Sequence, residues 1–387
     1  MTAIPHIYVV AAERSGDLLG AALIHSLKEK LKSDVHFSGV GGIGMAEEGI
    51  ESAVNIDGLS ILGFIEGLKA YGRVKEKVSE TVSDILKAQP DVVVLIDSWG
   101  FTLRVAQGVR AQAPHIKLVK YVGPQVFATR RGRAKTLAAT VDHLLTILSF
   151  DAIYYEAYGL PVTFVGNPTL ERPLIGNGAA FKRRHDLDPT RDSLIVLPGS
   201  RPSEIKRLFG PFARAIDILK NARPDLNIIV VLADPIDEMA RRRIDEDVRF
   251  NGVVVVSESE KADAFTASDL ALACSGTVVT ELSTAGIPSI AAYRLGWITW
   301  AIIRGLNVLK SRFISLVNIA ADQELVPEYV QTRCTGRKLA DEVSALLDDP
   351  ARRSKLRDQL RDVTRTMRGP GKASDRAASA VIDILKA

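Results

Sequence analysis

Short runs of valine, isoleucine and leucine alternate with helix-length amphipathic segments along the whole chain. Such runs occur, for example, at residues 7–11 and 92–96 in the first half and at 194–197 and 270–274 in the second. Runs this apolar predict strands that are covered on both faces, as in a parallel sheet between two layers of helices. Their alternation with helices predicts an α/β fold of doubly wound, Rossmann-like domains.

The length of 387 residues is about two to three times that of a typical domain. A polar stretch that contains proline and glycine, residues 168–189, separates the two sets of strands and predicts a linker. We therefore expect an N-terminal domain at 1–170, a C-terminal domain at 171–350, and a helical segment at 351–387 that packs back on the N-terminal domain or on a partner subunit. Two doubly wound domains in succession predict a ligand cleft at the carboxyl ends of their strands.

The composition narrows the classes of function. Hydrophobic residues make up 47% of the chain and charged residues 25%, as in an ordinary globular protein. The net charge of +4 is too small to indicate nucleic acid binding, but it suits an anionic ligand or an anionic membrane surface. The two cysteines, Cys274 and Cys334, and the six scattered histidines have no metal-ligand spacing, so we expect no metal and no cofactor.

The sequence also bears on location. Its start lacks the pattern of a signal peptide, and a strand pattern begins almost at once. The longest uncharged apolar run in the membrane-like segments, residues 295–303, is far shorter than the ~20 residues that span a bilayer. Few cysteines fit a reducing compartment, so we expect a cytoplasmic protein that is soluble or peripheral to the membrane.

A turn that contains glycine and serine follows the apolar run at 194–197. Gly199, Ser200 and Arg201 form it, and Pro202 suits the first position of a helix. A strand that ends in such a turn and leads into a helix directs free backbone N–H groups toward one point, which suits a phosphate. Arg201 would add a bidentate cation, although an ordinary strand-to-helix turn with a surface arginine also explains these residues.

The same arrangement follows the apolar run at 270–274. Ser275, Gly276 and Thr277 form the turn into a helix, and Glu281 lies one turn into that helix. A carboxylate there can accept hydrogen bonds from the two hydroxyls of a diol such as a ribose. Two helix starts suited to anions, together with an acid for a diol, predict a nucleoside diphosphate site in the second domain.

Polar residues also follow two strands of the first domain. Asp97 ends the run at 92–96, and a carboxylate at that edge of a sheet is a candidate general base. Glu13, Ser15 and Asp17 follow the first strand. The alternative is that Asp97 and Asp17 hydrogen-bond their turns and cap the helices that follow. The segment after the first strand does not match the GxGxxG pattern, so we expect no nicotinamide cofactor.

Two stretches combine an apolar face with basic residues. The first, residues 56–71, is followed by Arg73, Lys75 and Lys77, and the second covers residues 297–313. This pattern suits an anionic bilayer surface or acyl chains, and the alternative is a buried core helix or a dimer interface. In the first stretch, the residues expected to contact membrane or acyl chains are Ile61, Leu62, Phe64, Ile65 and Leu68.

Taken in order, these segments resemble the bacterial lipid A disaccharide synthase family of inverting glycosyltransferases, which have a two-domain GT-B fold. The resemblance extends over nearly the whole chain, and its motifs are modest one by one but specific as a series. They are AERSGD (12–17), LSILGFIEGL (59–68), PDVVVLIDS (90–98), VDHLLTILSFD (141–151), LPGSRPSEI (197–205), SGTVVTEL (275–282) and NIAADQELVPEYVQ (318–331).

The resemblance implies transfer of a 2,3-diacylglucosamine unit from its UDP donor to 2,3-diacylglucosamine 1-phosphate. The products would be the β-1,6-linked lipid A disaccharide 1-phosphate and UDP. The resemblance also implies work at the inner face of the cytoplasmic membrane of a Gram-negative bacterium, often as a homodimer built through the C-terminal region. It implies no metal, no other cofactor and no nucleic acid partner.

The family motifs also assign roles to single residues. They imply that Asp97 is the general base and that Glu13 belongs to the catalytic site with it. The UDP donor is expected at Gly199, Ser200, Arg201, Ser275, Gly276, Thr277 and Glu281. The acceptor and cleft positions are expected at Ser15, Gly16, Asp17, Pro124, Asn318, Glu324 and Glu328.

The sequence departs from the family pattern mainly in the first domain. The Ser-Pro-Ser-Val-Trp-Ala-Trp loop of the family is Gly-Pro-Gln-Val-Phe-Ala-Thr here, at residues 123–129. Arg130, Arg131 and Arg133 follow that loop and could still meet a sugar phosphate. These changes leave two alternatives open: a divergent GT-B UDP-sugar enzyme with another acceptor, and a catalytically silent relative that binds nucleotide sugar or membrane.

Overall fold

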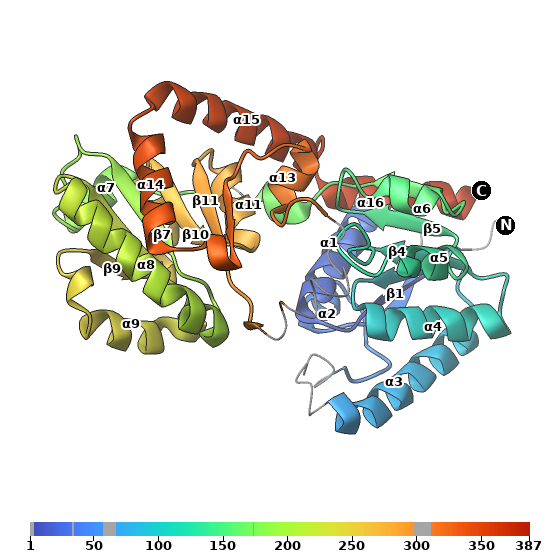
Figure 1. Cartoon of the computed structure of the whole chain (residues 1–387). Helices are drawn as coiled ribbons and strands as arrows, with labels where there is room; N and C mark the ends of the chain where they lie inside the picture. Colours follow the sequence, from blue (N-terminus) through green and yellow to red (C-terminus); the bar gives the residue numbers. More distant parts are fainter. Residues whose placement is uncertain (1–3, 33–34, 57–66, 173, 298–299, 301–310) are drawn as a thin grey trace. The chain divides into compact units, whose positions relative to one another are not determined.

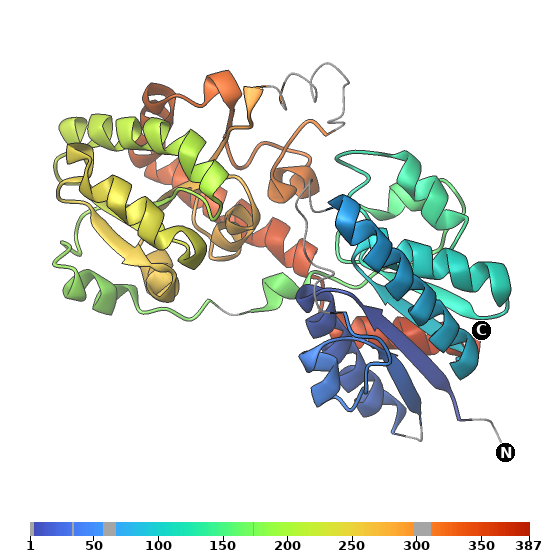
Figure 2. The same cartoon turned by 90° about the horizontal axis from the view of Figure 1, so that it is seen from below.

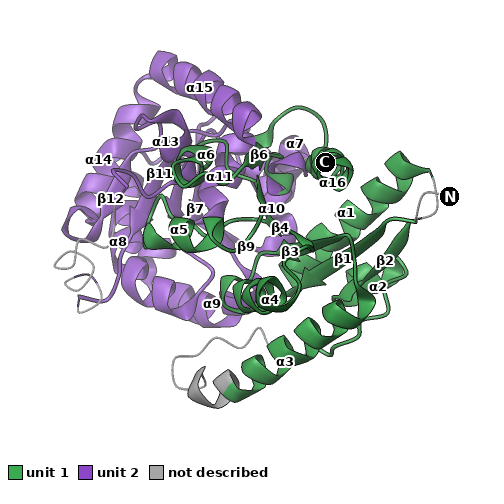
Figure 3. Cartoon of the chain, turned by 90° about the vertical axis from the view of Figure 1, so that its right-hand side faces the viewer, with its two compact units in different colours: residues 1–168, 368–387 green, residues 169–367 purple. Residues whose placement is uncertain are grey.

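The computed structural model describes residues 4–32, 35–56, 67–172, 174–297, 300 and 311–387, with the backbone alone for residues 67–71. The chain divides into two compact units, which Figure 3 shows in different colours. Unit 1 comprises Met1–Pro168 and Arg368–Ala387, and unit 2 comprises Thr169–Met367. Each unit is built on its own parallel sheet with helices on both faces, which confirms the predicted α/β fold of doubly wound domains.

Unit 1 contains a six-stranded sheet in the order β2-β1-β3-β4-β5-β6, in which every neighbouring pair is parallel. Ala11 pairs with Ile96, and Ile96 pairs with Tyr121, so β1, β3 and β4 end at the same level. The segments that follow these three strands therefore lie at one edge of the sheet. The strands are β1 (His6–Ala11), β2 (His36–Val40), β3 (Val92–Ile96), β4 (Lys117–Tyr121), β5 (His143–Thr146) and β6 (Val162–Phe164).

Helices cover both faces of this sheet because successive side chains of a strand point to opposite faces. Tyr8 and Val10 of β1 pack with residues of α3 and α4, whereas Ile7 and Val9 pack with residues of α1 and α16. Figure 1 labels these four helices around the sheet. The α-helices of unit 1 are α1 (Arg14–Leu31), α2 (Ile43–Glu47), α3 (Gly67–Ala88), α4 (Trp99–Gln112), α5 (Gly132–Ala138), α6 (Ala152–Glu156) and α16 (Ala373–Lys386).

The last helix of the chain, α16, belongs to unit 1 and lies along α1, as Figure 2 shows. Its apolar residues complete one face of the core of unit 1. Three polar contacts fix it: Ser26 Oγ donates to Asp375 at 2.9 Å, Lys117 Nζ donates to the carbonyl of Ile384 at 2.8 Å, and Arg376 Nε donates to the carbonyl of Val165 at 2.6 Å. The chain thus returns to its first unit after completing the second.

Unit 2 repeats the plan with a parallel sheet in the order β12-β11-β10-β7-β8-β9. Its strands are β7 (Ser193–Leu197), β8 (Asn227–Leu232), β9 (Val254–Ser257), β10 (Leu270–Cys274), β11 (Ser289–Tyr293) and β12 (Glu328–Val330). Its α-helices are α7 (Gly178–Arg184), α8 (Pro202–Ala222), α9 (Asp237–Asp245), α10 (Lys261–Thr266), α11 (Thr277–Thr284), α13 (Leu316–Ala321), α14 (Gly336–Leu347) and α15 (Pro350–Arg368).

Alternate residues of β7 again divide the core of unit 2. Leu194 and Val196 pack with α8 and α14, and Ile195 and Leu197 pack with α7, α10 and α11 on the other face. Short 3₁₀ helices connect the elements: η1 (Pro168–Glu171), η2 (Asp234–Ile236), η3 (Val248–Phe250), η4 (Glu258–Glu260) and η5 (Gln331–Arg333). Among the helices that the structure describes, none is both long and apolar enough to cross a bilayer.

Candidate functional site

The strongest candidate in unit 1 is the turn that follows β3. Asp97 and Ser98 both have left-handed backbone conformations, with φ of 44° and 40°, which residues other than glycine rarely adopt. The N–H of Asp97 donates to the carbonyl of Tyr121 at 2.9 Å, and the hydroxyl of Thr102 donates to the carbonyl of Asp97 at 2.6 Å. The half-buried carboxylate of Asp97 accepts no hydrogen bond from the residues that the structure describes.

Lys120 lies beneath this turn and was not singled out from the sequence. Its side chain is only 2% exposed, and its Nζ donates to the carbonyl of Asp97 and to Thr102 Oγ1, the latter at 2.7 Å. Burial lowers the pKa of Lys120 to about 7, although the negative charge of Asp97 opposes this shift. A lysine between Val119 and Tyr121 in a buried strand is the signal that could have identified this residue.

Glu13 meets the same turn from the neighbouring strand. It precedes α1, and its Oε1 accepts a hydrogen bond of 3.3 Å from Ser98 Oγ. Ser15 is exposed in the first turn of α1, whereas Gly16 is buried against Ala11 and Ile96. The structure therefore brings Glu13 to the residue next to Asp97, and it leaves the Ser15 hydroxyl on the surface.

Asp17 has a different position, inside unit 1. It is 4% exposed, and its carboxylate accepts three backbone hydrogen bonds from the N–H groups of Gly42 (2.8 Å), Gly44 (2.7 Å) and Met45 (3.0 Å). Three N–H donors satisfy a buried carboxylate well, because hydrogen bonds to an ionised acceptor are strong. Asp17 thus fixes the glycine-rich turn between β2 and α2.

The turn that contains Pro124 follows β4 and is fixed by Tyr155. The hydroxyl of Tyr155 donates to the carbonyl of Pro124 at 2.6 Å. A Cβ atom on Gly123 would lie only 2.7 Å from the Tyr155 oxygen, so the hydroxyl occupies the space that a side chain at Gly123 would need. The family loop carries a serine at the position of Gly123. In this chain the Tyr155 hydroxyl lies where that serine side chain would begin.

Asp151 lies close to this turn and is 1% exposed. Its Oδ2 accepts a hydrogen bond of 3.1 Å from Thr146 Oγ1, and its Oδ1 has no partner within the described part of the chain. Burial raises the pKa of Asp151 to about 7, and the hydrogen bond from Thr146 opposes the shift. A buried carboxyl group with one unpaired oxygen is poised to carry a proton near neutral pH.

In unit 2, the two predicted phosphate turns follow adjacent strands. Ala273 of β10 pairs with Leu197 of β7, so both turns lie at the same edge of that sheet. At the first turn, Glu204 Oε2 accepts the backbone N–H groups of Ser200 (3.0 Å) and Arg201 (3.2 Å). A carboxylate of the chain itself therefore occupies the N–H groups that the sequence assigned to a phosphate. The Arg201 side chain remains 78% exposed, with its Nη1 3.8 Å from Glu204 Oε1.

At the second turn the N–H of Ser275 donates to the carbonyl of Ala292 at 2.9 Å, whereas the N–H groups of Gly276 and Thr277 have no partner among the described residues. Gly276 is the residue before α11, no side chain caps the helix there, and a Cβ atom on Gly276 would meet nothing within 4 Å. Glu281 forms an ion pair of 3.0 Å with Lys261, a residue that sequence reasoning missed. Burial lowers the pKa of Lys261, but the hydrogen bonds and charges of Glu281 and Glu258 together outweigh burial, so the pKa of Lys261 lies above its ordinary value. Of the two turns, the one before α11 is the one whose N–H groups are not occupied by a carboxylate of the described residues.

Asn318 and Glu328, two of the residues expected at the acceptor or cleft, form a hydrogen-bond network inside unit 2. Asn318 is fully buried; its Nδ2 donates to the carbonyl of Val326 and to Glu328 Oε1, and its Oδ1 accepts the N–H groups of Leu325 and Val326. The carboxylate of Glu328 also accepts the N–H groups of Ile314 and Ser315. These side chains hold the segments around α13 and β12 together.

Glu324 is exposed and lines, with Glu328, a cavity of about 420 Å³. The other residues that line this cavity are Trp300, Ser311, Arg312, Phe313, Ile314, Val330 and Arg333. Two of the predicted acceptor or cleft residues thus share one cavity, and it carries both acidic and basic side chains.

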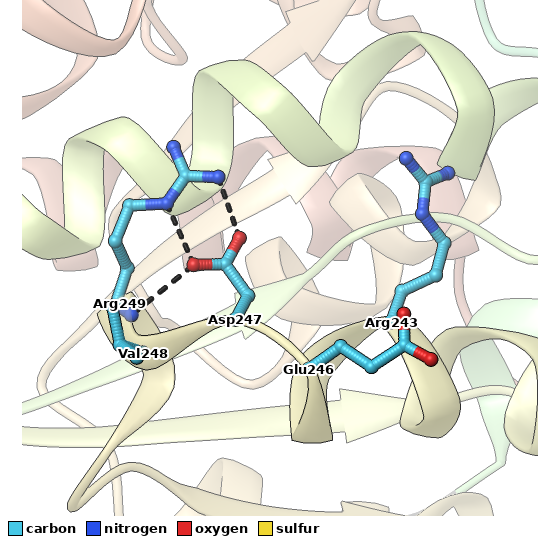
Figure 4. A pocket seen from close by; sticks show the side chains of 5 residues that line it. All are labelled: Arg243, Glu246, Asp247, Val248 and Arg249. Carbon is cyan, nitrogen blue, oxygen red and sulfur yellow. Dashed lines mark hydrogen bonds and ion pairs between the residues drawn. The ribbon is translucent and has the colours of Figure 1, made fainter.

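A second polar hollow lies at the end of α9, where Arg249 binds Asp247 through two side-chain hydrogen bonds (Figure 4). Arg243, Glu246 and Val248 complete its lining, and it contains no residue expected at the site. Within the described ranges, no group of three or more His, Cys, Asp or Glu residues could hold a metal ion.

The predicted membrane contacts cannot be placed in the same way. Ile61, Leu62, Phe64 and Ile65 lie outside the described residues. The backbone at Leu68 lies in the first turn of α3, and its side chain also falls outside the described part.

Comparison with known proteins places this arrangement in a family. A family model described as Lipid-A-disaccharide synthetase matches residues 7–382. The Lipid-A-disaccharide synthase of Rhodospirillum centenum is 38% identical over 381 residues, which cover 98% of this chain and 94% of that protein. The Lipid-A-disaccharide synthase of Paramagnetospirillum magneticum is 40% identical over 387 residues, which cover 98% of this chain and 97% of that protein.

Solved structures share the fold at much lower identity. The S. aureus MnaA–UDP co-structure has a TM-score of 0.62 at 10% identity, and the alignment covers 99% of this chain and 96% of that one. A glycosyltransferase from Rickettsia africae has a TM-score of 0.61 at 12% identity, with 99% and 98% covered. These similarities confirm the expected GT-B fold. The family model and the two close relatives show that this chain belongs to the lipid-A-disaccharide synthetase family of glycosyltransferases.

Proposed function

We propose that this chain transfers the 2,3-diacylglucosamine unit of its UDP conjugate to 2,3-diacylglucosamine 1-phosphate. The products are the lipid A disaccharide 1-phosphate and UDP. The observation that carries this proposal is the Asp97 carboxylate, which ends β3 in a fixed left-handed turn and accepts no hydrogen bond from the described residues. A general base must have free lone pairs and a fixed position, and Asp97 has both.

In the proposed reaction, the oxygen of the acceptor's 6-hydroxyl group attacks the anomeric carbon of the donor sugar. Asp97 takes the proton of that hydroxyl group at the same time. The bond from that carbon to the UDP oxygen breaks on the opposite face, so the configuration inverts and UDP leaves as the anion. Ser98 and Glu13, which are joined by a hydrogen bond, line the same turn and orient the acceptor. Lys120 below the turn keeps the carboxylate in place.

We assign the donor to unit 2 and the acceptor to unit 1. The UDP diphosphate binds at the open start of α11, formed by Ser275, Gly276 and Thr277, and Arg201 adds an exposed guanidinium. Glu281 accepts the ribose hydroxyls, with Lys261 as its ion-pair partner. The S. aureus MnaA–UDP co-structure and the UDP-GlcNAc 2-epimerase of Neisseria meningitidis bound to UDP-GlcNAc share this fold, and they support a uridine nucleotide as the donor moiety.

Four other assignments belong to the same proposal. Asp17, Asn318 and Glu328 act as positioning residues, because their hydrogen-bonding atoms are used within their own units. Ile61, Leu62, Phe64, Ile65 and Leu68 contact acyl chains or the inner-membrane surface. The protein works at the cytoplasmic face of that membrane. It does so as a homodimer built through its C-terminal region.

The test is a product assay with purified protein, UDP-2,3-diacylglucosamine and 2,3-diacylglucosamine 1-phosphate in detergent. We expect UDP and a disaccharide 1-phosphate in equal amounts, with a β-1,6 linkage by NMR spectroscopy. Tight UDP binding without any disaccharide would contradict the proposal and would favour a silent relative.

A further inference from the structure

Three arginines that follow β4 in unit 1 have no counter-ion among the residues that the structure describes. Arg130, Arg131 and Arg133 lie between the end of β4 and the first turns of α5, and none of them forms an ion pair or a side-chain hydrogen bond with a described residue. Arg110 of the same unit differs clearly, because its guanidinium donates to Asp142 at 2.6 Å and to two backbone carbonyls. Among the described residues, the three arginines therefore make none of the side-chain hydrogen bonds and ion pairs that hold Arg110 in place.

Two of these cations are close enough to disturb each other. The pKa of Arg133 is lowered, first by partial burial and second by the positive charge of Arg130. Like charges near each other disfavour their charged forms unless an anion lies between them. A pair of guanidinium groups with no carboxylate partner in the described part of the chain suits an anion with two or more acceptor oxygens.

The pair is held in a fixed arrangement before any ligand arrives. The guanidinium of Arg133 lies over the ring of Trp99, 5.1 Å from its centroid. Trp99 begins α4 and is separated from Asp97 only by Ser98. The backbone of Arg130 is left-handed, with φ of 51°, and its carbonyl accepts the N–H of Arg133 at 2.9 Å. Cation–π stacking limits the rotation of the Arg133 side chain, and the turn fixes the backbone of Arg130 relative to that of Arg133.

We propose that Arg130 and Arg133 bind the phosphate monoester of the acceptor sugar, with Trp99 as the platform that holds Arg133. The inference rests on the proposed function and names the part of the acceptor that unit 1 recognises. A phosphate monoester carries close to two negative charges at neutral pH and offers three acceptor oxygens, which match two planar guanidinium groups.

The place of the pair favours the acceptor over the donor. The donor phosphates form a diphosphate that we assign to the α11 start in unit 2, whereas Arg130, Arg133 and Trp99 all belong to unit 1. In the acceptor, carbon 1 bears the phosphate and carbon 5 bears the carbon 6 hydroxymethyl group, and both ring carbons are bonded to the ring oxygen, so the phosphate and the reacting hydroxyl are near each other but separated by several bonds. A phosphate site next to Asp97, but not in contact with it, fits that separation.

The test compares two acceptors, 2,3-diacylglucosamine with and without its 1-phosphate, on wild-type protein and on the variants R130Q, R133Q and R130Q/R133Q. We expect the KM for the phosphorylated acceptor to rise about 10- to 100-fold, as for the loss of charge-assisted hydrogen bonds. The KM for the UDP donor and the kinetics with the dephosphorylated acceptor should stay unchanged. R133K keeps the charge but not the planar fork, and it should show an intermediate loss.

Lys135 supplies a matched control, because it is an exposed cation on the same helix. K135Q should leave both KM values unchanged. Equal loss with both acceptors, or no loss with either, would overturn the inference. If the variants lose binding to vesicles of phosphatidylglycerol but keep their KM in detergent, the cluster binds lipid headgroups, and the inference is likewise overturned.

A binding measurement separates this inference from the proposed function. Glucosamine 1-phosphate, the water-soluble head of the acceptor, is titrated into wild-type protein and R130Q/R133Q and followed by NMR spectroscopy. Binding that is lost in the double variant supports the phosphate site even if no disaccharide forms. Disaccharide formation by the wild type with equal binding by both proteins refutes the site and leaves the proposed function intact.

Discussion

The ammonium group of Lys120 donates a hydrogen bond to the backbone carbonyl of Asp97, the residue whose carboxylate we assign as the general base. The same ammonium binds Thr102 Oγ1, and Thr102 binds the Asp97 carbonyl in turn. A buried amine therefore holds the left-handed turn through its backbone, while the Asp97 carboxylate accepts no hydrogen bond from the described residues. The position of Asp97, the assigned general base, therefore depends on Lys120, a residue to which we assign no contact with the substrate.

Replacing Lys120 with methionine should reduce kcat roughly 10- to 100-fold and change the KM values little. Loss of the ammonium leaves the turn free to move, and small displacements of a catalytic group have effects of this size. Steady-state kinetics and UDP titration provide the measurement. Lys117 is the matched control, since it lies on the same strand but donates to Ile384 in α16, so K117M should keep a normal kcat. A K120M variant with unchanged kcat would show that the turn needs no such support.

Replacing Asp17 with alanine should lower the free energy of unfolding by about 3 kcal/mol. The change leaves the N–H groups of Gly42, Gly44 and Met45 without their acceptor inside unit 1. Urea unfolding followed by circular dichroism measures this loss. D375A on α16 removes a single hydrogen bond with Ser26 and should cost about 1 kcal/mol. Normal stability of D17A with a raised acceptor KM would instead indicate direct contact with substrate.

Replacing Gly123 with serine should destabilise the protein by about 1–3 kcal/mol, because the new Cβ atom meets the Tyr155 hydroxyl. The cost should be smaller in a Y155F background, which lacks that oxygen. Thermal unfolding of the two single variants and the double variant gives the interaction energy. Strictly additive costs would mean that Tyr155 does not occupy the space at Gly123.

Replacing Asp151 with asparagine should stabilise the protein more at pH 8 than at pH 4. The pKa of Asp151 in the folded protein is raised from 3.8 to about 7, so the folded state binds more protons than the unfolded state within this window. The raised pKa of Asp151 therefore stabilises the folded state fully below pH 3.8, and this stabilisation is lost as the pH rises through about 7. Asparagine cannot ionise, so the D151N variant does not lose stability in this way as the pH rises.

Unfolding in urea at several pH values checks the Asp151 prediction. D358N, the same exchange at an exposed residue, serves as the control for the chemical change itself. A constant difference between D151N and wild type would show that Asp151 keeps an ordinary titration in the folded protein.

The sequence predicted most of the fold because the sheets are parallel and buried on both faces. Runs such as 92–96 and 194–197 are continuous apolar strands, and they became β3 and β7. The three-residue strand β12 has no such run, since Glu328 begins it, and its identity depends on pairing with β11. Short strands that are stabilised by their neighbours carry little signal of their own.

The site was harder to predict because the sequence does not show which polar atoms already form hydrogen bonds within the folded protein. The strand ends at Asp97 and Ser275 were correctly expected at the edges of their sheets. The sequence did not reveal that Glu204 takes the N–H groups of Ser200 and Arg201, or that Asn318 is fully buried. Such contacts join residues through the folded backbone, and residue type alone is compatible with either a ligand or an internal partner.

The replacement of Asp97 with asparagine tests the central claim most directly. Asparagine keeps the shape of the side chain but cannot take a proton, so single-turnover formation of disaccharide should fall by about 10²- to 10⁴-fold. The dissociation constant for UDP, measured by calorimetry, and the unfolding temperature should match those of the wild type. Wild-type turnover by D97N would contradict the assignment of Asp97 as the base, and so would a loss of folding in place of a loss of turnover.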